Sequence, residues 1–67
     1  MKDHEQRVVL EKTELDIKVR ALASFTSGSE VFAALPAFDR VLLRDQLRFM
    51  KEYSNVLGRR IERFTID

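Results

Sequence analysis

Three arginines occupy two helical turns near the C-terminal end of the chain, and the chemistry they favour is anion binding. Arg59, Arg60 and Arg63 lie within the stretch 57–64. Arg59 and Arg63 are four residues apart, so their side chains share a helix face and can hold one phosphate through their forked guanidinium groups. Cations at a helix end also complement the helix dipole, which explains part of the pattern. Gly58 is not explained by the dipole. Glycine inside a helix costs about 1 kcal/mol relative to alanine and suggests that another backbone or a ligand approaches closely.

Aromatic rings that can accompany these cations are Phe32 and Tyr53. We expect Phe32 to be exposed by the geometry of a turn, and either ring has a flat face on which a base can stack. Taken alone, each ring is more often part of a core. In an antiparallel hairpin the C-terminal arginine cluster comes next to the start of the first helix, where Arg7 adds a fourth cation. Arginines combined with stacking rings at a subunit boundary are what a nucleotide pocket requires.

Catalysis is not predicted. His4 stands alone near the N-terminus, and Ser27 and Ser29 lie in a turn, so no nucleophile, base and orienting group share a suitable spacing. One histidine and no cysteine make neither a metal site nor a disulfide framework. We therefore expect no enzyme activity, no cofactor and no metal.

Composition narrows the class of protein. A chain of 67 residues is expected to form one domain, 1–67, which is too small to bury a comfortable core alone. Charged residues make up 34% and no apolar run reaches the roughly 20 residues that span a bilayer, so neither a membrane segment nor a signal peptide is expected. The cytoplasm is the expected location. A net charge of +1 argues against a protein devoted to duplex nucleic acid.

The expected fold is all-α, and a first long helix should position the N-terminal half. Asp3 followed by Gln6 predicts a helix start with a capping box, and nothing interrupts the helix before Phe25. The stretch 26–29 is rich in turn formers. Gly28 is expected to take the left-handed conformation that ends many helices.

A short helical turn and a second long helix should follow. Ser29 can cap one turn over 30–34, and Pro36 suits the first position of a helix that runs to about Phe64. Two long helices joined by so short a connection must lie antiparallel, as a helical hairpin.

Heptad spacing predicts which faces of the two helices meet. Apolar residues recur every seven positions in two rows, which should form the contact between the helices: Val8, Leu15 and Leu22, and Leu43, Met50, Leu57 and Phe64. A second, mostly polar row is expected beside them: His4, Glu11, Lys18 and Phe25, facing Arg60, Tyr53, Gln46 and Asp39 in turn. Its polar members either fix the register through hydrogen bonds or line a cleft completed by another subunit.

Apolar residues remain after that contact is filled. They form one stripe on each helix: Leu10, Ile17 and Ala21, and Phe38, Leu42, Phe49 and Val56. A monomer would leave both stripes in water, and contiguous apolar patches of this kind mark protein interfaces. We therefore expect a symmetric homo-oligomer.

The pattern as a whole resembles a family of small phage proteins, the helical-hairpin domain shared by anti-CBASS protein 2 and Thoeris anti-defence protein 1. The residues that carry the resemblance span nearly the whole chain: His4, Arg7, Val8, Glu11, Leu15, Lys18, Leu22, Phe25, Phe32, Leu35, Leu42, Leu43, Gln46, Met50, Tyr53, Leu57, Arg60 and Ile61.

The resemblance implies a hexameric sponge that sequesters cyclic di- or trinucleotides, or glycocyclic ADP-ribose, without cleaving them in the infected bacterial cytoplasm. Phe32 would then stack on a base while Arg59 and Arg63 hold phosphates. Arg7 is implied for a separate trinucleotide site, and Lys18 for a contact in the dinucleotide pocket. Helix one has no Tyr for stacking, unlike some members.

Two other functions are compatible with the sequence. One is a non-catalytic adaptor whose apolar stripes bind a host or phage protein. The other is a small nucleic-acid binder that uses the arginines at 59–63, which the near-zero net charge weakens.

Overall fold

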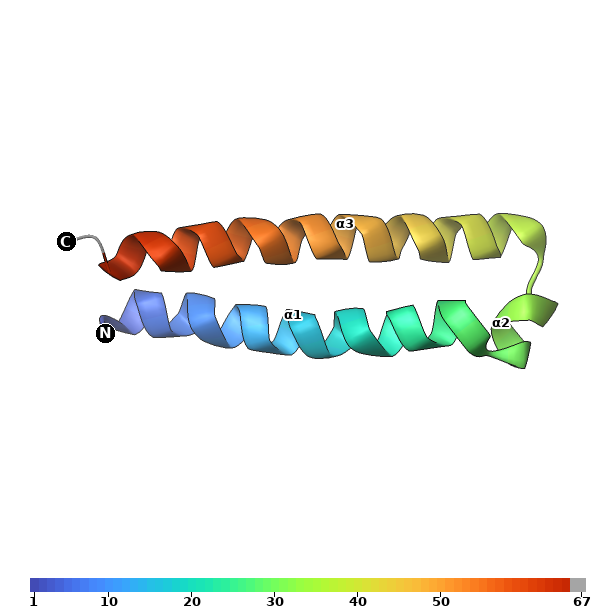
Figure 1. The fold of residues 1–67 in the computed structure, drawn as a ribbon, viewed down its shortest axis with the longest axis horizontal. Coiled ribbons are helices and arrows are strands. Elements are labelled where there is room, and N and C mark those ends of the chain that lie inside the picture. Colours follow the sequence, from blue (N-terminus) through green and yellow to red (C-terminus); the bar gives the residue numbers. More distant parts are fainter. Residues whose placement is uncertain (66–67) are drawn as a thin grey trace.

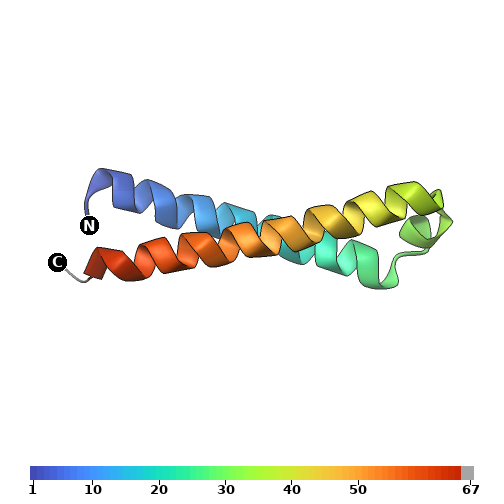
Figure 2. The same ribbon diagram turned by 90° about the horizontal axis from the view of Figure 1, so that it is seen from above.

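Two long antiparallel helices form a narrow rod, as Figure 1 shows in a computed structural model that describes residues 1–65. The elements are α1 (Asp3–Gly28), α2 (Glu30–Ala34), α3 (Ala37–Glu62) and a final 3-10 turn, η1 (Arg63–Thr65). The rod measures 50 × 15 × 14 Å, and both termini lie at its open end. Figure 2 shows that α1 and α3 cross at a shallow angle near their middles. The predicted all-α helical hairpin is confirmed.

Helix α1 begins and ends differently from the prediction. Its N-cap is Lys2, not Asp3, because the Glu5 carboxylate accepts a hydrogen bond from the Lys2 backbone N–H at 2.9 Å. Asp3 instead occupies the first turn, where its negative charge complements the helix dipole. The helix continues past Phe25 to Gly28, which does not take a left-handed conformation; no described residue has a positive φ.

Ser29 separates α1 from α2. Its backbone is extended, with φ −80° and ψ 130°, and its Oγ accepts hydrogen bonds from the N–H groups of Val31 and Phe32 at 3.1 and 3.2 Å. The predicted capping role is confirmed. Pro36 is the N-cap of α3 and not its first helical residue, and regular α-helix ends at Glu62 before η1 begins.

The predicted apolar rows do form the contact between α1 and α3, which we call the seam. Leu57 is fully buried, Val8 is nearly so, and the remaining members of both rows are half-buried: Leu15, Leu22, Leu43, Met50 and Phe64. At the open end the rings of His4 and Phe64 meet edge to face with centroids 6.5 Å apart. Apolar burial along this one contact holds the hairpin together.

The second row of the seam lies one residue later on each helix than predicted. The residues that face the partner helix are buried or half-buried: Glu5, Lys12, Val19 and Thr26, and Arg40, Leu47, Ser54 and Ile61. All members of the predicted row except Phe25 are exposed. The second row can follow each residue of the first apolar row by three or by four positions. After Val8 the four-residue choice is Lys12, and Lys12 is the residue that faces α3.

A network of polar side chains links α1 to α3 in the middle of the seam. The Lys12 ammonium donates to Asp16 Oδ2 at 2.8 Å and to Ser54 Oγ at 2.9 Å, while the Ser54 hydroxyl donates to the other Asp16 oxygen. These hydrogen bonds, led by that from Lys12, lower the pKa of Asp16 below its ordinary value of 3.8. A polar network inside an apolar contact favours one register, because any slip leaves its members without partners.

Gly58 belongs to the same arrangement. A Cβ at this position would stand 3.3 Å from Cε of Lys12. The predicted close approach exists, but the neighbour is a side chain of α1 and neither another backbone nor a ligand. The glycine lets the lysine stem pass α3 to reach Ser54.

The predicted leftover stripes are confirmed as exposed. Leu10 and Ile17 on α1, together with Phe38, Leu42, Phe49 and Val56 on α3, are each more than half exposed, and Ala21 is exposed too. None of the described helices combines the length and apolarity that a bilayer crossing demands. The oligomer itself stays a prediction.

A Gly58→Ala substitution tests the contact with Lys12. The alanine should raise the free energy of unfolding by about 1 kcal/mol through its higher helix propensity. When Lys12 is present, the new methyl group displaces the lysine stem, which offsets part of that increase. In a Lys12→Ala background the full gain should appear. Chemical denaturation of the four chains in this double-mutant cycle measures the coupling, and additive effects would contradict the proposed contact.

Acid should weaken the fold partly through Asp16. The pKa of Asp16 is lowered in the folded state, so its carboxylate contributes fully to the free energy of unfolding above pH 3.8. This contribution decreases as the pH falls below 3.8 and is lost once the pH is below the lowered pKa. Thermal melts between pH 7 and pH 2 at fixed protein concentration should therefore show a smaller acid-induced decrease in Asp16→Asn than in the natural chain. Equal decreases would exclude this carboxylate as a source of the acid sensitivity.

Candidate functional site

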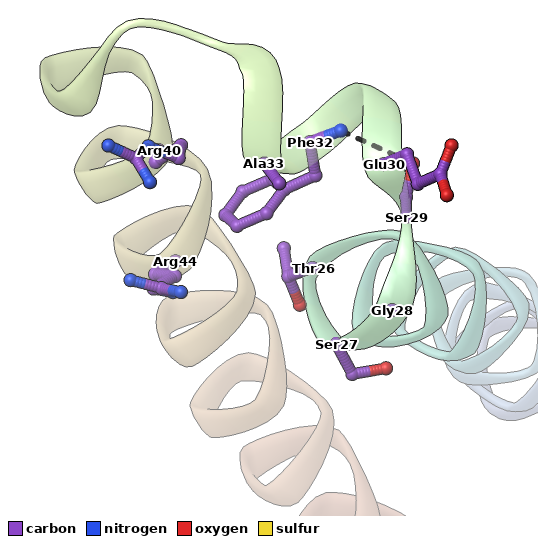
Figure 3. Close-up of a pocket in the computed structure, with 9 residues that line it drawn as sticks. All are labelled: Thr26, Ser27, Gly28, Ser29, Glu30, Phe32, Ala33, Arg40 and Arg44. Atoms are coloured by element: carbon purple, nitrogen blue, oxygen red, sulfur yellow. Dashed lines mark hydrogen bonds between the residues drawn. The ribbon is translucent and has the colours of Figure 1, made fainter.

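An open pocket lies at the closed end of the hairpin, where α1, α2 and α3 meet (Figure 3). Its volume is about 330 Å³, at the lower end of the roughly 300–1,000 Å³ typical of ligand sites. The lining comes from the end of α1, the connection, α2 and the first turns of α3: Thr26, Ser27, Gly28, Ser29, Glu30, Phe32, Ala33, Arg40 and Arg44. We call this the turn pocket.

Two arginines one helical turn apart supply its positive charge. Arg40 is half-buried on the seam side of α3, and its Nε is buried without a hydrogen-bond partner. The guanidinium of Arg44 lies over the Phe32 ring, 5.1 Å from the centroid, in a cation–π contact. Neither arginine forms an ion pair within the described part of the chain. Both charges are therefore available to an anion.

Two of the three hydroxyl groups around the pocket already donate their protons to backbone carbonyls. Thr26 donates to the Ala23 carbonyl and Ser27 to the Ser24 carbonyl, each at 3.2 Å, and Ser29 caps α2. A hydroxyl has one proton to donate, so Thr26 and Ser27 can only accept further hydrogen bonds unless they rotate, whereas Ser29 accepts as a cap and keeps its proton. The arginines are thus the principal donors that the pocket presents.

The pocket suits a phosphate or another compact oxyanion. A buried donor without a partner costs about 1–3 kcal/mol, and an anion bound to Arg40 would remove that cost. Guanidinium groups bind phosphate oxygens through paired, charge-assisted hydrogen bonds. The carboxylate of Glu30 repels an anion bound to the arginines only weakly, because it lies on the side of α2 away from both of them (Figure 3).

Phe32 is the one predicted site residue that lines the turn pocket. The expectation that it would be exposed is wrong, since only 4% of its surface is accessible. One neighbour is Phe25, whose ring meets it edge to face at 5.6 Å, and another is the Arg44 guanidinium. Helix α2 folds the ring back onto α1 and α3, so Phe32 supports Arg44 and offers no free face to a base in this conformation.

The other predicted site residues lie elsewhere on the rod. Arg7, Arg59, Arg60 and Arg63 are exposed at the open end, beside both termini and at the opposite end from Phe32. Lys18 and Tyr53 are exposed along the middle of α1 and α3. The hairpin therefore brings Arg7 to the same end as the C-terminal arginines, as predicted, but a single chain cannot join them to Phe32.

Arg40 and Arg44 were missed by the sequence interpretation. They have the same four-residue spacing that drew attention to Arg59 and Arg63. What distinguishes them is their position directly after the connection, where α2 supplies a third wall. That signal could have been found by asking which arginine pair follows the turn.

No group of three or more His, Cys, Asp or Glu that could hold a metal occurs among residues 1–65.

Comparison with known proteins identifies the family. The family model described as Sequestin matches residues 2–63, which is nearly the whole chain. No curated protein and no solved structure matches. The fold and the residue pattern agree with this match, and the chain belongs to the Sequestin family, the family of anti-CBASS and anti-Thoeris sponges that its sequence resembles.

Proposed function

We propose that this chain binds cyclic nucleotide immune signals and holds them without cleaving them, so that a CBASS or Thoeris effector is not activated. The ligands are cyclic di- or trinucleotides, or glycocyclic ADP-ribose. Membership of a family of sequestering proteins supports the class of function. The observation that carries the proposal is the buried Nε of Arg40, which has no hydrogen-bond partner, in a pocket that also contains Arg44, which forms no ion pair.

Phosphate is the group that the turn pocket recognises. Every candidate ligand carries phosphodiester or diphosphate groups, and two guanidinium groups one turn apart can surround one such group from two sides. A single charge-assisted hydrogen bond contributes about 1.5–3 kcal/mol, so two arginines supply enough to select phosphate-containing ligands.

The pocket volume limits how much of a ligand one chain can enclose. About 330 Å³ accommodates a small molecule or one part of a cyclic oligonucleotide. The bases must then contact other surfaces, and stacking on Phe32 requires Arg44 to leave its ring. Sequestration itself needs only affinity and abundance, which a short chain with no catalytic groups can provide.

Titration calorimetry with cyclic di- and trinucleotides and glycocyclic ADP-ribose tests the function. The natural chain should bind at least one of them, and the doubly substituted Arg40→Ala, Arg44→Ala chain should bind at least about tenfold more weakly, because each lost charge-assisted hydrogen bond costs more than 1.4 kcal/mol. Mass spectrometry of the recovered ligand should show its original mass. Absence of heat with every ligand would overturn the proposal.

A matched control removes two positive charges from the other end of the rod. Arg59→Ala with Arg63→Ala changes the net charge equally but leaves the turn pocket intact. Near-natural affinity in this control places the phosphate in the turn pocket. Loss of binding in the control alone would instead assign the ligand to the C-terminal arginines, as the sequence interpretation did.

A further inference from the structure

The guanidinium of Arg44 covers the aromatic ring that borders the turn pocket. It lies 5.1 Å from the centroid of the Phe32 ring, and only 4% of the Phe32 surface is accessible. Figure 3 shows the ring projecting from α2 toward the two arginines of α3. The ring of Phe25 on α1 meets Phe32 edge to face and holds it from another side. Arg44 itself is exposed, so its side chain can rotate off the ring without any change in the backbone.

A second cation–π pair on the same helix shows how Arg44 differs from an ordinary surface arginine. Arg48 lies 4.7 Å from the centroid of the Phe49 ring, but it also approaches Asp45 at 3.7 Å, and Phe49 is 56% exposed. Arg44 has no carboxylate partner among residues 1–65, and the ring beneath it is buried. The charge of Arg44 is thus free to pair with an anion, and its departure exposes a ring that is otherwise covered.

We propose that Arg44 makes the turn pocket selective for nucleotides over phosphate alone, an inference that rests on the proposed function. One side chain serves both the anion and the ring. An anion bound to Arg40 lies within one helical turn of Arg44, so rotation of the Arg44 side chain brings its guanidinium onto the same phosphate. Paired, charge-assisted hydrogen bonds are stronger than a cation–π contact at an exposed site, so the bound phosphate draws Arg44 off Phe32.

This exchange favours ligands that carry both a phosphate and a base. A phosphate without a base leaves the uncovered Phe32 ring in water, which is unfavourable for an apolar surface. A nucleotide covers the ring again with its base, because aromatic faces stack on any base. A nucleoside without phosphate must displace Arg44 and gives it no anion in return. The pocket therefore remains available to nucleotides in a cell that also contains inorganic phosphate.

Calorimetry with two matched probes measures the selectivity. AMP and ribose-5-phosphate share a ribose and a phosphate and differ by the base. The natural chain should bind AMP at least about tenfold more tightly, which is within the contribution expected of one stacked base. In Phe32→Leu the ratio of the two affinities should fall to about one, with the helical circular dichroism retained. A ratio near one in the natural chain would overturn the proposal, as would the absence of AMP binding.

Substitution of Arg44 separates its two roles. Arg44→Ala should weaken AMP binding at least about tenfold, because the phosphate loses a charge-assisted pair. The same change should strengthen adenosine binding at least about threefold, because the ring no longer has to lose a cation–π contact. Arg48→Ala is the matched control, since it removes the same charge and another cation–π contact outside the turn pocket, and it should change neither affinity. Adenosine binding that does not improve in Arg44→Ala would contradict the proposal.

Nuclear magnetic resonance of the natural chain observes the exchange directly. Protons held over an aromatic face resonate upfield, so the side-chain signals of Arg44 should move downfield when AMP binds. The signals of Arg48 over Phe49 should stay in place and serve as the internal reference. Arg44 signals that stay upfield in AMP-saturated protein would overturn the exchange but leave the proposed function standing. Binding of AMP without binding of any cyclic nucleotide or glycocyclic ADP-ribose would overturn the proposed function alone, so the two failures are distinguishable.

Discussion

The packing of the leucine rows between α1 and α3 is the interaction on which the rest of this structure depends. A rod of two helices has only one internal face, so each helix can bury a single stripe of side chains. Along the seam this burial is complete at Leu57 and nearly complete at Val8. Because the seam is antiparallel, the two ends of the rod become chemically different. The closed end gathers the connection, α2 and the first arginines of α3, while the open end gathers both termini and the C-terminal arginines.

The Lys12, Asp16 and Ser54 network gives that seam its register. Apolar rows alone would tolerate sliding one helix along the other by one heptad. Such a shift would separate Lys12 from Ser54 and place its ammonium against an apolar member of the same row of α3. Gly58 provides the space that the lysine stem needs. The same register brings Thr26 of α1 and Arg40 of α3 into the lining of the turn pocket at the closed end.

A short hairpin satisfies neither all its charges nor all its apolar side chains. At the closed end, the guanidinium of Arg40 lacks an acceptor. Along the outside of α3, Phe38, Leu42, Phe49 and Val56 are each more than half exposed. An arginine without an acceptor is suited to bind an anion, and an exposed apolar stripe is suited to contact another surface.

The sequence by itself determined the helical hairpin, the Leu57 row, the capping role of Ser29 and the leftover stripes, because heptad spacing and turn residues are local properties that packing seldom overrides. Tertiary structure alone decided which neighbours join that row. Glu11 and Lys12 flank Val8 at spacings of three and four residues, and only contact with α3 showed that Lys12 faces inward. Likewise, the pairing of Phe32 with Arg44 needs α2 folded against α3, a long-range contact that residue spacing does not encode.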